Sequence, residues 1–342
     1  MKLGLTLGYW GRTMPEGVPA LVAEVERLGF DSLWTAESWG SDCLTPLAWW
    51  GSRTARMRLG TNLMQLSART PTAAAMAAIT MDHLSGGRFV LGLGVSGPQV
   101  VEGWYGQPFP KPLARTREYV SIIRKVLARE ERVTNQGPHY PLPYPGGLGL
   151  GKPLKVMTHP LRADIPIFLG AEGPRNVALA AEIADGWFPI FYSPRHEHLY
   201  EESLREGWSR PGARRTPGEF EILPTVTVVV DDDVEAAADA LRPMVALYVG
   251  GMGAREMNFH YDVFCRLGYE AQAARIQSLF LDGHQREAVA AVPTAMVEEI
   301  ALIGPREKIR DEIELWKRSR VTTMILGTRD VAVLRMMAEL VL

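Results

Sequence analysis

The stretch Arg58–Val95, RLGTNLMQLSARTPTAAAMAAITMDHLSGGRFVLGLGV, contains two short apolar segments separated by a helical one. Arg58–Met64 and Phe89–Val95 have the length and composition of buried strands. Between them, Pro71–Leu84 is rich in alanine and carries proline in its first turn, where the missing amide proton costs nothing. Strand, helix and strand in this order predict two parallel strands joined by a helical crossover.

The same alternation continues over most of the chain. The other strand segments are Leu3–Gly8, Ser32–Ala36, Ile165–Gly170, Gly186–Ile190, Glu221–Val230 and Thr322–Leu326. With the two above they make eight strands, which favours a closed barrel over an open doubly wound sheet. No G-x-G-x-x-G turn follows the first strand, which also counts against an open dinucleotide-binding sheet. We therefore predict an α/β fold, a (β/α)8 TIM barrel that occupies residues 1–342 as a single domain.

Two stretches interrupt this alternation. Residues 130–164 are rich in proline and glycine and predict a long loop insertion. Residues 234–297 are mostly helical in pattern and exceed what one crossover needs, which predicts a helical insertion near the barrel mouth. Long ordered loops on a barrel are usually functional, so we expect these insertions to influence the choice of substrate.

Composition excludes several classes of partner. Hydrophobic residues make up 46% and charged residues 22% of the chain, as in ordinary globular proteins. The 37 Lys and Arg against 39 Asp and Glu leave no basic excess for nucleic acid. No run of eighteen apolar residues is present, so we expect no membrane span. Two cysteines form no disulfide framework and the histidines no metal-ligand pattern, which predicts no metal site and a cytoplasmic location.

A candidate anion site lies where the chain turns from a strand into a helix at Gly170–Asn176, GAEGPRN. Free backbone amides at a helix start, helped by the helix dipole, bind phosphate and other anions. Gly173 would let the backbone approach the ligand, and Arg175 and Asn176 could add side-chain donors. The same residues also fit an ordinary strand-to-helix turn, in which proline and glycine only end one element and begin the next.

Three further strand ends carry candidate site residues. Leu91–Trp104, LGLGVSGPQVVEGW, has glycines that would leave room for a flat ligand or would serve close packing. In Gly60–Pro71, polar residues interrupt the strand, and a bulge near Asn62–Leu63 would turn the backbone into the mouth. Glu37 stands among Tyr9, Trp10 and Trp39. A carboxylate in such surroundings can act as a proton donor, although it is more often paired or solvated.

The segments RLGTNLMQLSARTP, MDHLSGGRFVLGLGVSGPQVVEGWYG and IPIFLGAEGPRNVALAAEIADGWFP occur here in the order typical of one family. The chain resembles the bacterial luciferase-like (LLM) superfamily and, within it, the deazaflavin-dependent oxidoreductases that use coenzyme F-420. The resemblance runs from Met1 to about Pro194 and returns in GPREKIRDEIELWKRSRV. The L-S-G-G-R motif of Leu84–Arg88 and the A-D-G motif of Ala184–Gly186 make it specific, whereas the helical insertion is poorly covered.

The resemblance implies a barrel with the cofactor across its carboxyl-end mouth. It places a non-proline cis peptide at Asn62–Leu63, with Leu63 behind one face of the deazaflavin ring. Glu37 and Ser38 replace the Asp-His of relatives that oxidise sugar phosphates, which puts that activity in doubt. Residues implied to contact the cofactor ring and ribityl chain are Ser96, Gly97, Gln99 and Val100. Those implied to grip its phosphate are Gly170, Ala171, Glu172, Gly173, Pro174, Arg175 and Asn176.

The implied activity is transfer of a hydride between reduced coenzyme F-420 and a small organic substrate, with a carbonyl compound or activated alkene favoured. We expect Glu37 to move the proton and Tyr9, Trp10, Trp39 and Trp104 to line the substrate pocket. One alternative is an FMN-dependent luciferase-like monooxygenase. Another, of a different class, is a non-catalytic carrier of flavin or deazaflavin. A homodimer is the expected assembly.

Overall fold

The computed structural model describes residues 1–342, and all of its named strands pair in parallel within one sheet. The strand order is β10-β9-β11-β1-β2-β3-β5-β6-β7-β8, with β4 beside β5. The strands are β1 (Lys2–Gly8), β2 (Ser32–Thr35), β3 (Arg58–Thr61), β4 (Met64–Gln65), β5 (Phe89–Gly94), β6 (Ile167–Gly170), β7 (Gly186–Phe188), β8 (Glu221–Ile222), β9 (Thr225–Val230), β10 (Ala301–Gly304) and β11 (Thr323–Leu326).

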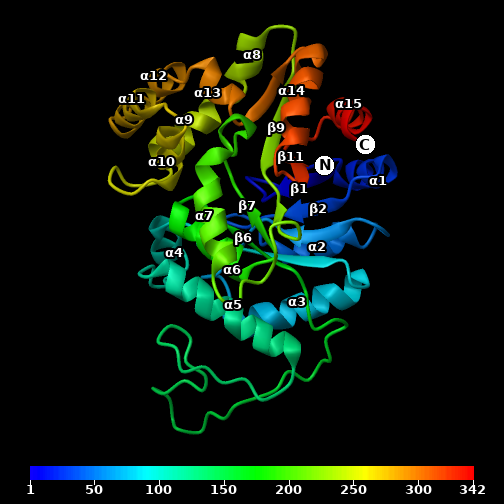
Figure 1. Ribbon diagram of the computed structural model, residues 1–342, viewed down its shortest axis with the longest axis vertical. Coiled ribbons are helices and arrows are strands. Elements are labelled where there is room, and N and C mark those ends of the chain that lie inside the picture. Colours follow the sequence, from blue (N-terminus) through cyan, green and yellow to red (C-terminus); the bar gives the residue numbers. More distant parts are fainter.

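The helices alternate with these strands and surround them in Figure 1. They are α1 (Val18–Leu28), α2 (Leu44–Gly51), α3 (Pro71–Ser85), α4 (Pro98–Gly103), α5 (Pro112–Ala128), α6 (Pro174–Ile183), α7 (His198–Ser209), α8 (Val234–Asp239), α9 (Arg242–Gly251), α10 (Phe259–Arg266), α11 (Glu270–Leu281), α12 (Gln285–Ala290), α13 (Thr294–Glu298), α14 (Arg306–Arg318) and α15 (Val331–Val341), with a 3-10 turn at Pro194–His196. None combines the length and apolar composition needed to cross a membrane.

The sheet closes into a barrel through the segment Glu221–Val230. Its first part, β8, pairs with β7, and its second part, β9, pairs with β11, which in turn pairs with β1. The predicted (β/α)8 barrel is therefore confirmed. Between β8 and β9 stands Pro224, which has no amide proton for the ladder, although its carbonyl still accepts from the Ile325 amide at 3.0 Å.

Besides the division of Glu221–Val230 at Pro224, two further strands differ from the sequence prediction. The predicted strand Arg58–Met64 is divided into β3 and β4, because the chain bulges at Asn62–Leu63. β10 was not predicted at all, and it pairs with β9 on the side away from the barrel. Its four residues, Ala301–Gly304, are too few to show a strand pattern in the sequence.

Large side chains fill the barrel interior, so it is a packed core. The interior cluster consists of Trp34, Val90, Phe168, Phe188, Leu223 and Ile325. Trp34 is fully buried, and its indole N–H donates to the Ser32 hydroxyl at 2.9 Å. A Cβ atom at Gly60 would lie 2.1 Å from the Trp34 ring, so the neighbouring strand needs glycine there.

Helix α3 shows how the local sequence sets an outer helix. Thr70 caps its start, because the Thr70 hydroxyl accepts a hydrogen bond from the Ala73 amide at 3.3 Å. Gly86 ends it with φ of 64°, a left-handed conformation that glycine adopts without strain. Between these ends, small alanine side chains let the helix pack closely on the barrel.

The two interruptions of the alternation lie apart from each other (Figure 1). Residues 234–297 contain α8 to α12 and most of α13 and pack around a separate cluster of 19 buried residues. Residues 130–164 follow α5 as a loop with two isolated antiparallel bridges, Val133 to Leu154 and Asn135 to Leu142. In Figure 1 this loop projects from the body at the bottom of the view. The division of the chain into domains stays a prediction.

Candidate functional site

The predicted site residues follow the carboxyl ends of neighbouring strands. Tyr9 and Trp10 follow β1, Glu37 follows β2, and Leu63 follows β3. The Ser96–Val100 segment follows β5 and the Gly170–Asn176 segment ends β6. Because parallel strands all end at the same face, the barrel gathers these segments at one mouth.

The bulge after β3 is held by its neighbour β2. The Asn62 amide donates to the Thr35 carbonyl at 2.6 Å, and the Leu63 carbonyl accepts from the Glu37 amide at 3.2 Å. The Asn62–Leu63 peptide bond is cis, as the resemblance implied. The strand then resumes as β4, where Met64 pairs with Leu93 of β5.

Leu63 lies on two glycines at the mouth. A Cβ atom at Gly94 would lie 2.6 Å from Leu63 Cδ1, and one at Gly170 would lie 2.4 Å from the same atom. Leu63 is half-buried and packs against the interior cluster from above. Gly94, one of the glycines predicted to leave room for a flat ligand, therefore leaves room for Leu63. Its upper surface forms an apolar shelf at the barrel mouth.

Glu37 is enclosed by hydrogen-bond donors. Its side chain is 3% exposed, and Arg69 Nη1 lies 2.7 Å from Oε1 and 2.9 Å from Oε2. The Gln65 amide donates to Oε1 at 2.9 Å and the Cys43 amide to Oε2 at 3.3 Å. Burial raises the pKa of the Cys43 thiol, and the Glu37 charge raises it further. Burial opposes the charged form of Arg69, but the bonds to Glu37 outweigh it and raise the guanidinium pKa.

These contacts give Glu37 a clear structural task. The carboxylate ties the start of α2 and the strand β4 to Arg69, directly beyond the Leu63 shelf. Sequence reasoning did not single out Arg69. The only signal was one basic residue in the polar segment between β4 and α3. The role of Glu37 as proton donor stays a prediction, and its observed contacts support a positioning role.

The turn between β6 and α6 has the features of an anion site. Gly173 caps the helix without any side-chain hydrogen bond, and Pro174 begins it. The Asn176 and Val177 amides donate to the Gly173 carbonyl at 2.9 and 3.0 Å. The amides of Glu172, Gly173 and Arg175 donate to no group of the protein. Uncapped amides at the start of a ten-residue helix suit a phosphate.

The helical insertion reaches this turn through α10. His260 Nδ1 lies 2.9 Å from Glu172 Oε2, and Arg266 donates to the Glu172 carbonyl at 2.8 Å. The His260 ring packs edge-on against Tyr248 and Phe191. Sequence reasoning missed His260 and Arg266 as site residues, because they are 88 and 94 positions beyond Glu172 and only the docking of α10 brings them there.

The predicted aromatic residues form the rim. Tyr9, Trp39 and Trp104 are 41%, 51% and 65% exposed, and Trp10 is half-buried. The Trp10 amide donates to the Ser41 hydroxyl at 3.0 Å, which joins the ends of β1 and β2.

The loop between β5 and α4 contributes the other wall of the mouth. Ser96 has φ of 58°, an uncommon conformation for a residue other than glycine. Gln99 lies close enough that a Cβ atom at Gly97 would be 2.9 Å from its side-chain oxygen. Beyond α4, the Tyr105 hydroxyl donates to the Ser38 carbonyl at 2.9 Å. This bond brings the chain next to Trp104 against the loop that carries Trp39.

Comparison with known proteins agrees with this geometry. The family model described as luciferase-like monooxygenase matches residues 10–323. A protein of Mycobacterium tuberculosis that carries the provisional name coenzyme F-420-dependent oxidoreductase is 58% identical over 100% of this chain and 99% of its own.

Two solved structures share the fold. The coenzyme F-420-dependent tetrahydromethanopterin reductase of Methanopyrus kandleri has a TM-score of 0.80 at 22% identity, covering 99% of this chain and 97% of its own. An F-420-dependent secondary alcohol dehydrogenase, solved with an F-420-acetone adduct, has a TM-score of 0.74 at 19% identity and covers 99% and 98%. The family match and the identity over the full chain decide the assignment: this chain belongs to the luciferase-like monooxygenase family.

Proposed function

We propose that the chain is a coenzyme F-420-dependent oxidoreductase that transfers a hydride between the reduced cofactor and a small organic substrate, with a carbonyl compound or activated alkene favoured. The observation that carries this proposal is the pairing of an apolar shelf with an uncapped helix start at one barrel mouth. Leu63 on Gly94 and Gly170 would support a flat ring, and the free amides of the β6–α6 turn would hold a phosphate. The full-length relative named for this cofactor supports the choice.

The deazaflavin ring, when bound, supplies the hydride-carrying carbon. The residues of the chain then have three tasks. Leu63 would cover one ring face and leave the other to the substrate. The backbone amides of Glu172, Gly173 and Arg175 would hold the phosphate. The rim aromatics Tyr9 and Trp39 supply apolar surface for the substrate and limit the access of water.

A spectral titration tests the cofactor assignment. The purified protein is titrated separately with F-420 and with FMN, and the change in cofactor absorption gives each affinity. We expect tight binding of F-420 and at least tenfold weaker binding of FMN, followed by oxidation of reduced F-420 when a suitable ketone or enone is added. Tight binding of FMN with none of F-420 would instead establish the FMN-dependent monooxygenase.

The same assay tests the carrier alternative. A carrier would bind F-420 but leave its reduced form unchanged across a broad panel of ketones and enones. The assembly can be checked with the same preparation, since light scattering after size-exclusion chromatography gives the mass of the particle. We expect a homodimer, and we expect fractionation of the source cells to place the activity in the cytoplasm.

A further inference from the structure

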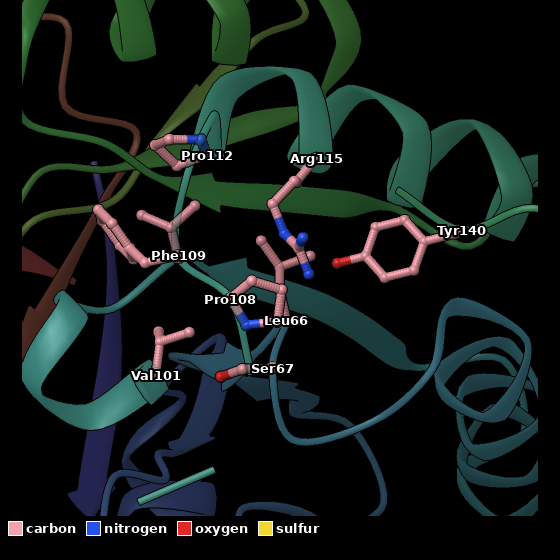
Figure 2. Close-up of a pocket in the computed structure, with 9 residues that line it drawn as sticks. Leu66, Ser67, Val101, Pro108, Phe109, Pro112, Arg115 and Tyr140 are labelled. Carbon is pink, nitrogen blue, oxygen red and sulfur yellow. The ribbon is translucent and has the colours of Figure 1, made fainter. Parts of the chain in front are cut away.

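A small, partly open pocket lies beyond the mouth, between the segment after β4, helix α4 and the start of α5 (Figure 2). Most of its wall is apolar and includes Leu66, Val101 and Phe109. Its polar groups belong to Ser67, Arg115 and Tyr140. We call it the Arg115 pocket. Ser67 is one of the polar residues that interrupt the predicted strand in Gly60–Pro71, whereas Arg115 and Tyr140 were not singled out from the sequence.

The guanidinium of Arg115 has no carboxylate partner. Arg69 is paired with Glu37 and Arg117 with Glu182, whereas Arg115 forms no ion pair and instead contacts the Tyr140 side chain. Its Cζ lies 5.2 Å from the centre of the Tyr140 ring. Figure 2 shows the guanidinium and the Tyr140 hydroxyl directed toward one another across the pocket.

The hydroxyl of Ser67 is the second unsatisfied group. Its Oγ is buried and has no hydrogen-bond partner. A buried hydroxyl without a partner costs free energy, and a partly buried guanidinium without a carboxylate can still accept an anionic partner. A carboxylate or phosphate would satisfy both groups, because the guanidinium fork matches two oxygens of an oxyanion.

A second cavity lies next to this pocket, and its lining includes Gly94, Gly170 and Asn176 of the proposed cofactor site. The two cavities share Leu66 and Val95 in their linings, so the Arg115 pocket is adjacent to the cavity beside the β6–α6 turn.

We propose that the Arg115 pocket is an oxyanion-binding site, in which Arg115, Ser67 and Tyr140 hold a carboxylate or phosphate attached to a partly apolar ligand. The oxyanion has two possible sources. One is the acidic part of the cofactor beyond its ring, and this source rests on the proposed function. The other is a substrate that carries a carboxylate. Both sources require the same contacts with Arg115.

Binding measurements on the purified protein test this proposal. The variants are Arg115→Met, Arg115→Lys and Ser67→Ala, and the matched control is Arg286→Met, which removes an exposed arginine that also lacks an ion pair. The probes are F-420, its deazaflavin core without phosphate and glutamate tail, and glutarate. Fluorescence gives the cofactor affinities and calorimetry gives that of glutarate. Thermal unfolding of each variant confirms that it is folded.

If the cofactor supplies the oxyanion, Arg115→Met weakens F-420 binding by about tenfold or more while the affinity for the core stays unchanged. If a substrate supplies it, the affinity for glutarate falls by a similar factor and that for F-420 stays. In both cases Arg115→Lys and Ser67→Ala have smaller effects. Equal affinities of Arg115→Met and Arg286→Met for every probe would overturn the proposal. Loss of glutarate binding in Arg115→Met, with no F-420 binding by the unaltered protein, would refute the proposed function and leave this site standing.

Discussion

At the amino end of the barrel, Asp185 is 4% exposed and is paired with Arg124, Arg214 and Arg215, and it also accepts from the Ile167 amide at 2.8 Å. At the carboxyl end, three amides of the β6–α6 turn have no partner within the chain, the buried Ser67 hydroxyl has none, and Arg115 has no carboxylate partner. The amino end pairs its buried carboxylate within the chain, whereas the carboxyl end leaves several donors without an acceptor.

The motifs that make the resemblance specific belong to the amino end. In the L-S-G-G-R motif, Arg88 donates to the Ser85 carbonyl at 2.8 Å and the Thr54 carbonyl at 3.0 Å. In the A-D-G motif, Asp185 forms the ion pairs described above. These residues therefore identify the family through the stability of its barrel. The site proposed for the activity lies at the opposite end, as is usual for this fold.

The strongest test of this contrast removes the buried charge at the amino end. We expect Asp185→Ala to lower the free energy of unfolding by about 3–5 kcal/mol, because it removes the buried carboxylate and leaves Arg124 and Arg214 only the half-exposed Asp164 as a partner. Denaturant unfolding measures the loss, and F-420 affinity of the folded fraction should stay unchanged. Asp164→Ala is the control. Asp164 contacts the same arginines but is 50% exposed, so its loss should cost less than about 1 kcal/mol. Equal losses of unfolding free energy in the two variants would show that the buried Asp185 stabilises the amino end no more than the exposed Asp164 does.

Glu37 is an exception at the mouth. Like Asp185 at the amino end, it is a buried carboxylate paired with an arginine. We expect Glu37→Gln to lower the free energy of unfolding by about 1.5–3 kcal/mol, because Arg69 loses its charged partner. The pH profile of turnover separates the two roles. A positioning residue leaves the shape of the profile unchanged, whereas loss of one limb would establish Glu37 as the proton donor. Asp42→Asn, at a 37% exposed carboxylate also near Arg69, is the control.

A methyl group added at Gly170, beneath Leu63, should weaken cofactor binding more than it lowers the free energy of unfolding. Gly170→Ala would push Leu63 out of place, at a cost of about 1 kcal/mol in the free energy of unfolding and about tenfold in F-420 affinity. In the double variant with Leu63→Ala the clash disappears, so the two stability changes should not add. Gly218→Ala, where a Cβ atom meets nothing within 4 Å, is the control. Additive effects would show that Gly170 does not act through Leu63.

The smallest expected effect is on the stability of the protein at low pH. Burial alone would raise the pKa of Asp185, but Arg124 and the Ile167 amide outweigh it, so the folded-state pKa lies below the ordinary value. The resulting stabilisation is fully present above the unfolded pKa of about 3.9 and is lost as pH falls through the folded value. We therefore expect the unaltered protein to lose stability below about pH 4 more steeply than Asp185→Asn. If the thermal midpoints of the two proteins fell equally with decreasing pH, protonation of Asp185 would not be a cause of the loss of stability in acid.

Much of this molecule could be predicted from local patterns. The alternation of strand and helix predicted the barrel, because periodicity depends only on neighbours along the chain. The turn at Gly170–Asn176 could also be recognised, since proline and glycine have fixed effects at a helix start. The break at Pro224 and the strand β10 were missed, because a short element is defined by the strand with which it pairs.

The sequence by itself thus determined the fold class, the order of the elements and the segments that meet at the mouth. Only the tertiary structure decided which polar groups find partners. Glu37 meets Arg69 across 32 positions, and Glu172 meets Arg266 across 94. Arg115 instead faces a pocket without a carboxylate. Hydrogen bonds and ion pairs require approach to within a few ångströms, and that approach is set by the packing of whole elements rather than by any local pattern.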